Sequence, residues 1–112
     1  MESTQLEPLI RDLFGEAREA RAGRSAVNLH PGRHHHLRQT VIAILADQRL
    51  DEHEAPPEAT LQVLSGSVRL TAGDETWDGS SGEVLVIPDR RHDLLALEDA
   101  AVLLTTYVPA GP

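Results

Sequence analysis

The feature that most constrains this fold is a succession of short apolar segments separated by turn residues, which runs from Leu37 to Val108. Each segment is rich in leucine and β-branched side chains, and glycine, proline or aspartate usually stands between one segment and the next. Short strands at short spacing with such turns are typical of antiparallel sheets. Together with a weaker alternating segment before them, the candidate strands are residues 25–30, 37–46, 61–64, 68–70, 76–78, 84–87, 92–97 and 100–108.

An amphipathic helix precedes the strands. Apolar residues recur there at steps of three and four, and charged residues fill the opposite face. We predict a helix from about Pro8 to Ala22, with Pro8 at the first helical position, where the missing N–H costs no hydrogen bond, and with Gly23 at its end. We expect the helix to cover the sheet, with a subunit contact as the alternative. Its apolar positions are Leu6, Leu9, Ile10, Leu13, Phe14 and Ala17.

The segment 37–46 is apolar at successive positions in its second half, so both of its faces must be covered. Val41 and Ala43 lie on one face, and Ile42 and Ile44 lie on the other. One face can point into a barrel, whereas the other needs the N-terminal helix or a second subunit. The sequence therefore predicts a homodimer.

These elements predict an all-β protein, an antiparallel double-sheet jelly roll with one N-terminal α-helix. A chain of 112 residues is long enough for one domain. Within it, residues 1–24 form a helical segment and residues 25–112 form the β-barrel domain. An immunoglobulin-like sandwich is the alternative, but the chain has no cysteine for the buried pair, and Trp77 lies in a short segment between turns.

A charged, proline-containing loop runs into two of the predicted strands between Asp51 and Leu70. The spacing predicts an antiparallel hairpin in which residues 61–64 and 68–70 pair across a turn at Gly66. The loop carries His53, and Pro56 and the proline after it should make it rigid. Loops held by a rigid scaffold often carry function, so we place the candidate site here.

This stretch resembles the first motif of the cupin superfamily, G-x5-H-x-H-x3,4-E-x6-G. Counting back from Gly66, the two histidine positions fall on His53 and Ala55, the glutamate position on Ala59 and the leading glycine on Asp47. One of the three ligands in this motif is therefore present.

A second stretch, from Gly82 to Ala96, resembles the second cupin motif, G-x5-P-x-G-x2-H-x3-N. Pro88 and His92 stand in place, while the loop between them is one residue shorter. Arg90 replaces the glycine, and Ala96 replaces the asparagine. The resemblance covers roughly residues 37–108 and implies the cupin fold, an RmlC-like jelly roll.

A metal site is what the resemblance implies for function. It places His53 and His92 as ligands of one divalent transition metal, Fe, Ni, Mn or Zn, which prefers three or four nitrogen and oxygen ligands. The third ligand is open between His35, from the triplet of histidines that ends at residue 36, and Glu54 or Glu58 of the loop. The structural alternatives are a solvated His53, a His92 bonded to a backbone carbonyl and an exposed triplet.

Two function classes follow from this resemblance. One is a metal-dependent enzyme in the style of small cupin isomerases or dioxygenases, in which the metal polarises substrate or activates oxygen. The other is a metal-free binding or sensing module that holds a small apolar or acidic molecule in the barrel. Alanine at the two missing ligand positions favours the second class or an altered enzyme. The expected pocket residues are Gln39, Glu58, Leu61 and Val63.

Composition excludes several other functions. The formal net charge of -8 argues against nucleic-acid binding, which needs clustered basic residues. No apolar run is long enough to cross a membrane and no charged-then-apolar leader opens the chain, so we expect a cytoplasmic protein. The absence of cysteine removes disulfides and thiolate chemistry. All ten basic residues are arginine, which suggests a GC-rich bacterial coding sequence.

Overall fold

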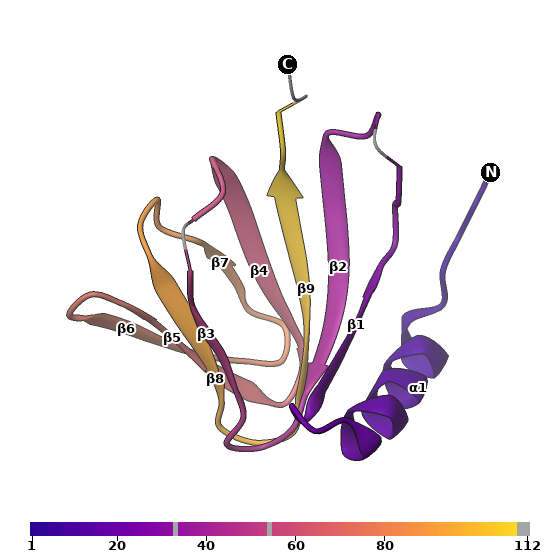
Figure 1. The fold of residues 1–112 in the computed structure, drawn as a ribbon, viewed down its shortest axis with the longest axis horizontal. Helices are drawn as coiled ribbons and strands as arrows, with labels where there is room; N and C mark the ends of the chain where they lie inside the picture. The colour runs from indigo at the N-terminus through magenta and orange to yellow at the C-terminus, as the bar shows by residue number, and fades with distance from the viewer. Residues whose placement is uncertain (33, 54, 110–112) are drawn as a thin grey trace.

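Two antiparallel sheets and one helix make up the part of the chain that this computed structural model describes, residues 1–32, 34–53 and 55–109, with the side chain of His53 left out (Figure 1). The five-stranded sheet has the order β1-β2-β9-β4-β7, and the four-stranded sheet has the order β3-β8-β5-β6. The elements are α1 (Leu6–Glu19), β1 (Arg24–Asn28), β2 (Leu37–Ile44), β3 (Arg49–His53), β4 (Glu58–Ser65), β5 (Ser67–Ala72), β6 (Glu75–Ser80), β7 (Val84–Val86), β8 (His92–Ala96) and β9 (Ala100–Tyr107). This confirms the predicted jelly roll with an N-terminal helix.

The main core lies between the two sheets, because one face of each sheet is apolar. In β4, every second residue is buried, from Ala59 through Leu61 to Val63. β9 lies between β2 and β4 and pairs with both along nearly its whole length. The buried residues of this core are Ile42, Ile44, Ala59, Leu61, Val63, Val68, Leu70, Ala72, Ile87, Leu94, Ala96, Ala100 and Val102.

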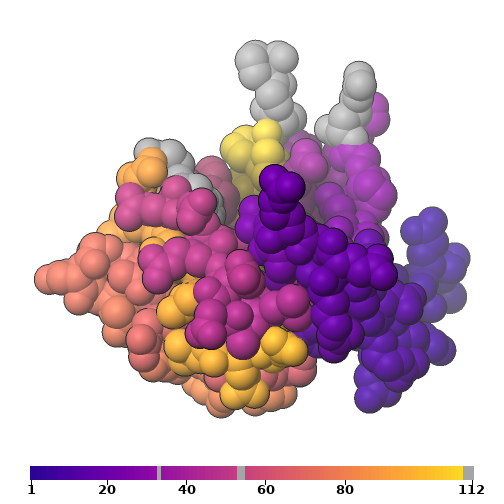
Figure 2. Space-filling view, turned by 60° about the horizontal axis from the view of Figure 1, so that its bottom comes forward, coloured from indigo at the N-terminus to yellow at the C-terminus, as the bar shows by residue number. Residues whose placement is uncertain are grey.

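A second, smaller core lies on the outer face of the five-stranded sheet, under α1. Leu13 of the helix packs with Val41 and Ala43 of β2, which confirms that both faces of this strand are covered. The helix lies at the opposite side of the molecule from β6 (Figure 1 and Figure 2). Most of its contacts with the sheet are made with β1 and β2.

The helix begins and ends earlier than predicted, at Leu6 and Glu19 rather than at Pro8 and Ala22. Pro8 is the third helical residue. It is tolerated there because the N–H groups of the first turn have no partner within the helix. In the described part of the chain, no helix has the length and apolar character needed to span a membrane.

The predicted hairpin around Gly66 is wrong, because its two strands belong to different sheets. β4 pairs with β7 and β9, whereas β5 pairs with β6 and β8. Gly66, with φ of +77°, turns the chain from one sheet to the other. A Cβ atom at this position would collide with the carbonyl oxygen of Asp99. A left-handed turn between two apolar segments fits a hairpin and a corner equally well, so local sequence did not distinguish them.

Residues 51–53 of strand β3 lie in the segment that the sequence predicts to be a charged loop. The sequence of this strand, Arg49–His53, is mostly charged and lacks the alternation that signals a half-buried strand. It is an edge strand of the four-stranded sheet, with β8 as its partner. The connection to β4 is therefore much shorter than the predicted loop.

Candidate functional site

His92 is the one buried polar residue in the described part of the chain, with 4% of its surface exposed. It is the first residue of β8, and its Nδ1 lies 2.9 Å from the backbone carbonyl oxygen of Arg90. A carbonyl oxygen only accepts hydrogen bonds, so Nδ1 carries the proton. In the neutral ring Nε2 is therefore the acceptor, which is the nitrogen that ligates metals or receives a proton.

A small apolar cavity adjoins His92 between the two sheets. Its volume is about 40 Å³, and His92 is the one polar side chain among the residues that line it. Of the predicted pocket residues, Leu61 lines this cavity, whereas Val63 belongs to the fully buried core and does not line it. The other residues around the cavity are Ile42, Leu50, Pro56, Leu70, Ile87, Leu94 and Leu104.

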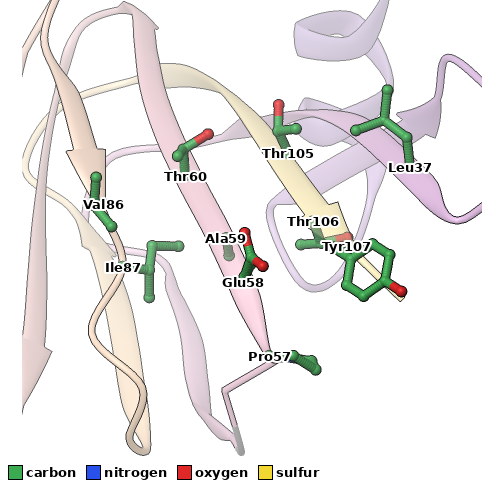
Figure 3. A pocket seen from close by; sticks show the side chains of 10 residues that line it. All are labelled: Leu37, Pro57, Glu58, Ala59, Thr60, Val86, Ile87, Thr105, Thr106 and Tyr107. Atoms are coloured by element: carbon green, nitrogen blue, oxygen red, sulfur yellow. The ribbon is translucent and has the colours of Figure 1, made fainter. Parts of the chain in front are cut away.

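A larger groove of about 430 Å³ opens beside this cavity, and Ile87 borders both (Figure 3). Figure 3 shows the residues that line it, most of which come from β7 and the residue after it, from the start of β4 and from the end of β9. Glu58, a predicted pocket residue, lines it. The remaining residues of its wall are Leu37, Ala59, Thr60, Val86, Thr105 and Thr106.

Gln39 was predicted to face the barrel interior, but the structure places it on the outer face of the sheet. There its Nε2 donates a 3.4 Å hydrogen bond to the hydroxyl of Thr105. Gln39 lines a different groove, beside Leu29 and the residues before α1. The prediction was wrong because it assigned the odd-numbered residues of β2 to the inner face. Ile42 and Ile44 face the interior, so the odd-numbered residues of this strand face outward.

His53 and His92 meet across two neighbouring strands, as their backbones are partners in the register of β3 and β8. This confirms, for the backbone, that two motif positions far apart in sequence come together. The register between Leu50 and His53 is irregular. The side chain of His53 and the whole of Glu54 lie outside the described residues.

The histidine triplet lies elsewhere, in the connection between β1 and β2. The ring of His35 stacks on that of His30 with 3.8 Å between centroids, and its Nδ1 lies 3.2 Å from the carbonyl oxygen of His30. His36 stacks against Tyr107 instead. The residues of this triplet are exposed. Among the described residues, no three histidine, aspartate or glutamate side chains gather closely enough to hold a metal ion.

The positions of the two cupin motifs offer fewer ligands here than a metal with three or four protein ligands needs. Ala59 stands at the glutamate position of the cupin motif. Its methyl group cannot bind a metal and is buried in the main core. Ala55 stands at the second histidine position. The motif positions therefore supply two imidazoles, and metals of this kind are retained by three or four ligands.

Two arginines, Arg90 and Arg91, directly precede His92 in the chain. Arg90 and Arg91 form ion pairs with Glu75 and Glu52, which neutralise them locally.

Sequence reasoning missed Tyr107, which lines the larger groove. It pairs with Glu58, a predicted pocket residue, across β9 and β4. The local sequence gives no signal for this pairing, because the two residues are brought together by strands that are distant in sequence.

Solved structures with the same arrangement are cupins. An RmlC-like cupin from Desulfovibrio desulfuricans is 26% identical, with a TM-score of 0.72 and 94% of each chain covered. A cupin superfamily protein from Desulfitobacterium hafniense is 17% identical, with a TM-score of 0.76, and the match covers 97% of this chain and 95% of that one.

A conserved Streptococcus pyogenes protein of unknown function is also similar, at 23% identity and a TM-score of 0.74, with 99% of this chain and 93% of that chain covered. No family model and no curated protein matches the sequence. The structural likeness extends over nearly the whole chain and agrees with the two sheets described above. The chain therefore has the fold of a small cupin domain, an RmlC-like jelly roll of two antiparallel sheets.

Proposed function

We propose that this protein is a metal-free binding or sensing module that holds a small molecule at the barrel mouth, with His92 as a polar contact. The observation that carries the proposal is the placement of His92, a buried imidazole with a defined tautomer beside an apolar cavity. Apolar pockets with a few fixed polar groups are typical of small-molecule sites, because the polar groups orient the ligand.

The two hollows at the mouth limit the size of the ligand. The cavity of about 40 Å³ has room for only a small apolar part of a molecule. The groove of about 430 Å³ is in the ordinary range for small-molecule sites, and Ile87 borders both hollows. We therefore expect a ligand with an apolar end near His92 and a larger part in the groove.

A divalent metal held by His53 and His92 is the second candidate, and the pairing of the two backbones across β3 and β8 favours it. Iron, nickel, manganese or zinc would then act as a Lewis acid or activate oxygen. A similar structure is a salicylate 1,2-dioxygenase from Pseudaminobacter salicylatoxidans, at 16% identity and with 33% of that chain covered. That activity belongs to that protein. The alanines at two ligand positions support the metal-free function for this chain.

Metal analysis distinguishes the two candidates. The protein is purified without a polyhistidine tag, incubated with Fe²⁺, Ni²⁺, Mn²⁺ or Zn²⁺ at neutral pH, desalted and measured by plasma mass spectrometry. We expect much less than one metal per chain, and the same amount in His53→Ala. One metal per chain that is lost in both His53→Ala and His92→Phe would overturn the metal-free function, and His35→Ala then tests whether the triplet supplies a third ligand.

Ligand binding is tested separately, with benzamide and hexanamide as neutral probes followed by amide chemical shifts. We expect shifts at Ile87, Leu104 and His92 in the native protein, and at least about tenfold weaker binding in His92→Phe, which fills the same space without an acceptor. Unchanged spectra at 10 mM of either probe would contradict a site at the barrel mouth.

We also propose that two copies associate through the part of the outer sheet face that α1 leaves uncovered. The helix already covers Val41 and Ala43, so these residues no longer require a second subunit. Other apolar side chains on the same face remain exposed, and a self-complementary contact would bury them. They are Leu37, Val84, Val86 and Tyr107. Leu37, Val86 and Tyr107 also line the groove of about 430 Å³, so the second copy would lie next to the proposed ligand.

A further inference from the structure

The floor of the larger groove is formed by the outer face of the five-stranded sheet. Glu58, the first residue of β4, pairs with Tyr107, the last residue of β9, and Thr60 pairs with Thr105 two residues further along. All four line the groove. Ala59, between Glu58 and Thr60, is buried in the main core, so alternation turns these four side chains outward. Among the described residues that line the groove, Glu58 has the one charged side chain.

The charge of Glu58 is not neutralised by the protein. Its carboxylate makes no ion pair and no hydrogen bond with another residue in the described part of the chain. By contrast, the exposed carboxylates of Glu52 and Glu75 each bind an arginine. A groove of about 430 Å³ whose charged group is an unpaired carboxylate attracts positively charged ligands, and the net charge of -8 acts in the same direction.

The ring of Tyr107 supplies a second contact for a cation. Cross-strand partners have their Cβ atoms about 5 Å apart. Figure 3 shows the carboxylate of Glu58 and the ring of Tyr107 at the same end of the groove. Tyr107 is 44% exposed, and its stacking partner His36 directly precedes β2, on the side away from β4. An ammonium group can therefore bind the carboxylate and lie against the aromatic ring.

The apolar part of the groove wall lies beside these two contacts. Val86 of β7 pairs with Thr60, which places it one strand and two residues away from Glu58. By the spacing of a sheet this is about 8 Å. Val86 is 75% exposed, and Ile87 after it also borders the small cavity at His92. A cation at Glu58 with an apolar body of this length would cover Val86.

We infer that the ligand of this groove is a primary amine with an apolar body, whose ammonium group binds the carboxylate of Glu58 and packs against the ring of Tyr107. This inference rests on the proposed small-molecule function and adds the chemical class of the ligand. A divalent metal ion suits the groove less well, because it needs several ligands, and no three histidine, aspartate or glutamate side chains gather among the described residues.

The test compares matched charged and neutral probes on the full chain at neutral pH. Benzylamine and hexylamine, which are protonated at this pH, are titrated against benzyl alcohol and hexanol, and dissociation constants are taken from amide chemical shifts. Because Glu58 is exposed to solvent, we expect a modest preference, with each amine bound about fivefold or more tightly than its alcohol. Raising the salt concentration should reduce this preference.

Three variants test the contacts. Glu58→Gln keeps the shape of the side chain and removes its charge, so it should abolish the preference for amines. Tyr107→Leu should reduce the preference in part, and an unchanged preference there would overturn the ring contact. Glu19→Gln is the matched control, because it removes the same charge from the end of α1 and should keep the preference. Glu58→Gln breaks no contact among the described residues, so we expect a native-like amide spectrum, which verifies its fold.

The outcomes separate this inference from the binding function. Shifts in the groove with equal affinity for amines and alcohols, or a preference that survives in Glu58→Gln, would overturn the amine inference and leave the binding function standing. An equal loss of preference in Glu19→Gln would also overturn it, because the attraction would then come from the net charge. If neither these probes nor the neutral amides shift residues of the groove or the cavity at 10 mM, the binding function fails as well.

Discussion

At the scale of single residues, His92 combines two roles, since it faces the cavity and its Nδ1 proton bonds to the carbonyl oxygen of Arg90. Only 4% of its surface is exposed. We predict that His92→Ala lowers the free energy of unfolding by about 2–4 kcal/mol, from a cavity and an unpaired carbonyl. Urea denaturation measures it, and a change below about 0.5 kcal/mol would mean that the imidazole is not buried.

The glycine positions of the two cupin motifs share a backbone conformation. Gly66 and Gly82 have φ of +77° and +95°, and Asp47, which replaces the leading glycine, has φ of +68°. The spacing of the cupin motifs therefore reflects the positions of left-handed turns as well as those of metal ligands.

Gly66→Ala and Gly82→Ala separate backbone strain from steric collision. A Cβ atom at Gly82 meets open space, whereas one at Gly66 meets the backbone of Asp99 and Ala100. We predict that Gly82→Ala lowers the unfolding free energy by about 1–2 kcal/mol, from the left-handed conformation alone. Gly66→Ala should lower it clearly further. Equal losses in urea denaturation would show that the corner between the sheets can shift to admit a methyl group.

At the scale of elements, α1 covers the outer face of β2, for which the sequence predicted either the helix or a second subunit as the cover. Its Leu13 is 2% exposed against Val41 and Ala43, whereas its Gly15 has open space around it. Leu13→Ala should therefore lower the unfolding free energy by about 2–4 kcal/mol, and Gly15→Ala should raise it by about 0.5–1 kcal/mol through helix propensity. Thermal or urea denaturation checks both. A neutral Leu13→Ala would show that the helix is not docked on the sheet.

At the scale of the whole molecule, the uncovered part of the outer sheet face predicts association. Val86 is 75% exposed on the edge strand β7, so an isolated chain leaves it in water. We expect a dimer at micromolar concentration by light scattering. Val86→Asp should shift the mass toward the monomer, because burying an unpaired charge at an interface is unfavourable. The control Leu97→Asp, which changes an exposed leucine between β8 and β9, should leave the dimer intact. A monomeric mass for the native protein would contradict the dimer.

The sequence by itself determined the local structure and much of the core. Period-two alternation placed Leu61 and Val63 inside the barrel, and apolar residues at steps of three and four placed Leu13 against the sheet, because these patterns depend only on the geometry of a strand or a helix. The motif spacing also identified His92 and its position opposite His53, since the turn glycines set where each strand begins.

Only the tertiary structure decided which strands pair and which face of each strand is inside. Gly66 permits both a hairpin and a corner, and β9, from the far end of the chain, takes the place beside β4 that β5 was expected to occupy. The same long-range pairing set the parity of β2, which turned Gln39 outward. Successive residues of a strand face opposite sides of the sheet, and this is known from the sequence alone. Which side becomes the interior depends on contacts with strands that are distant in sequence.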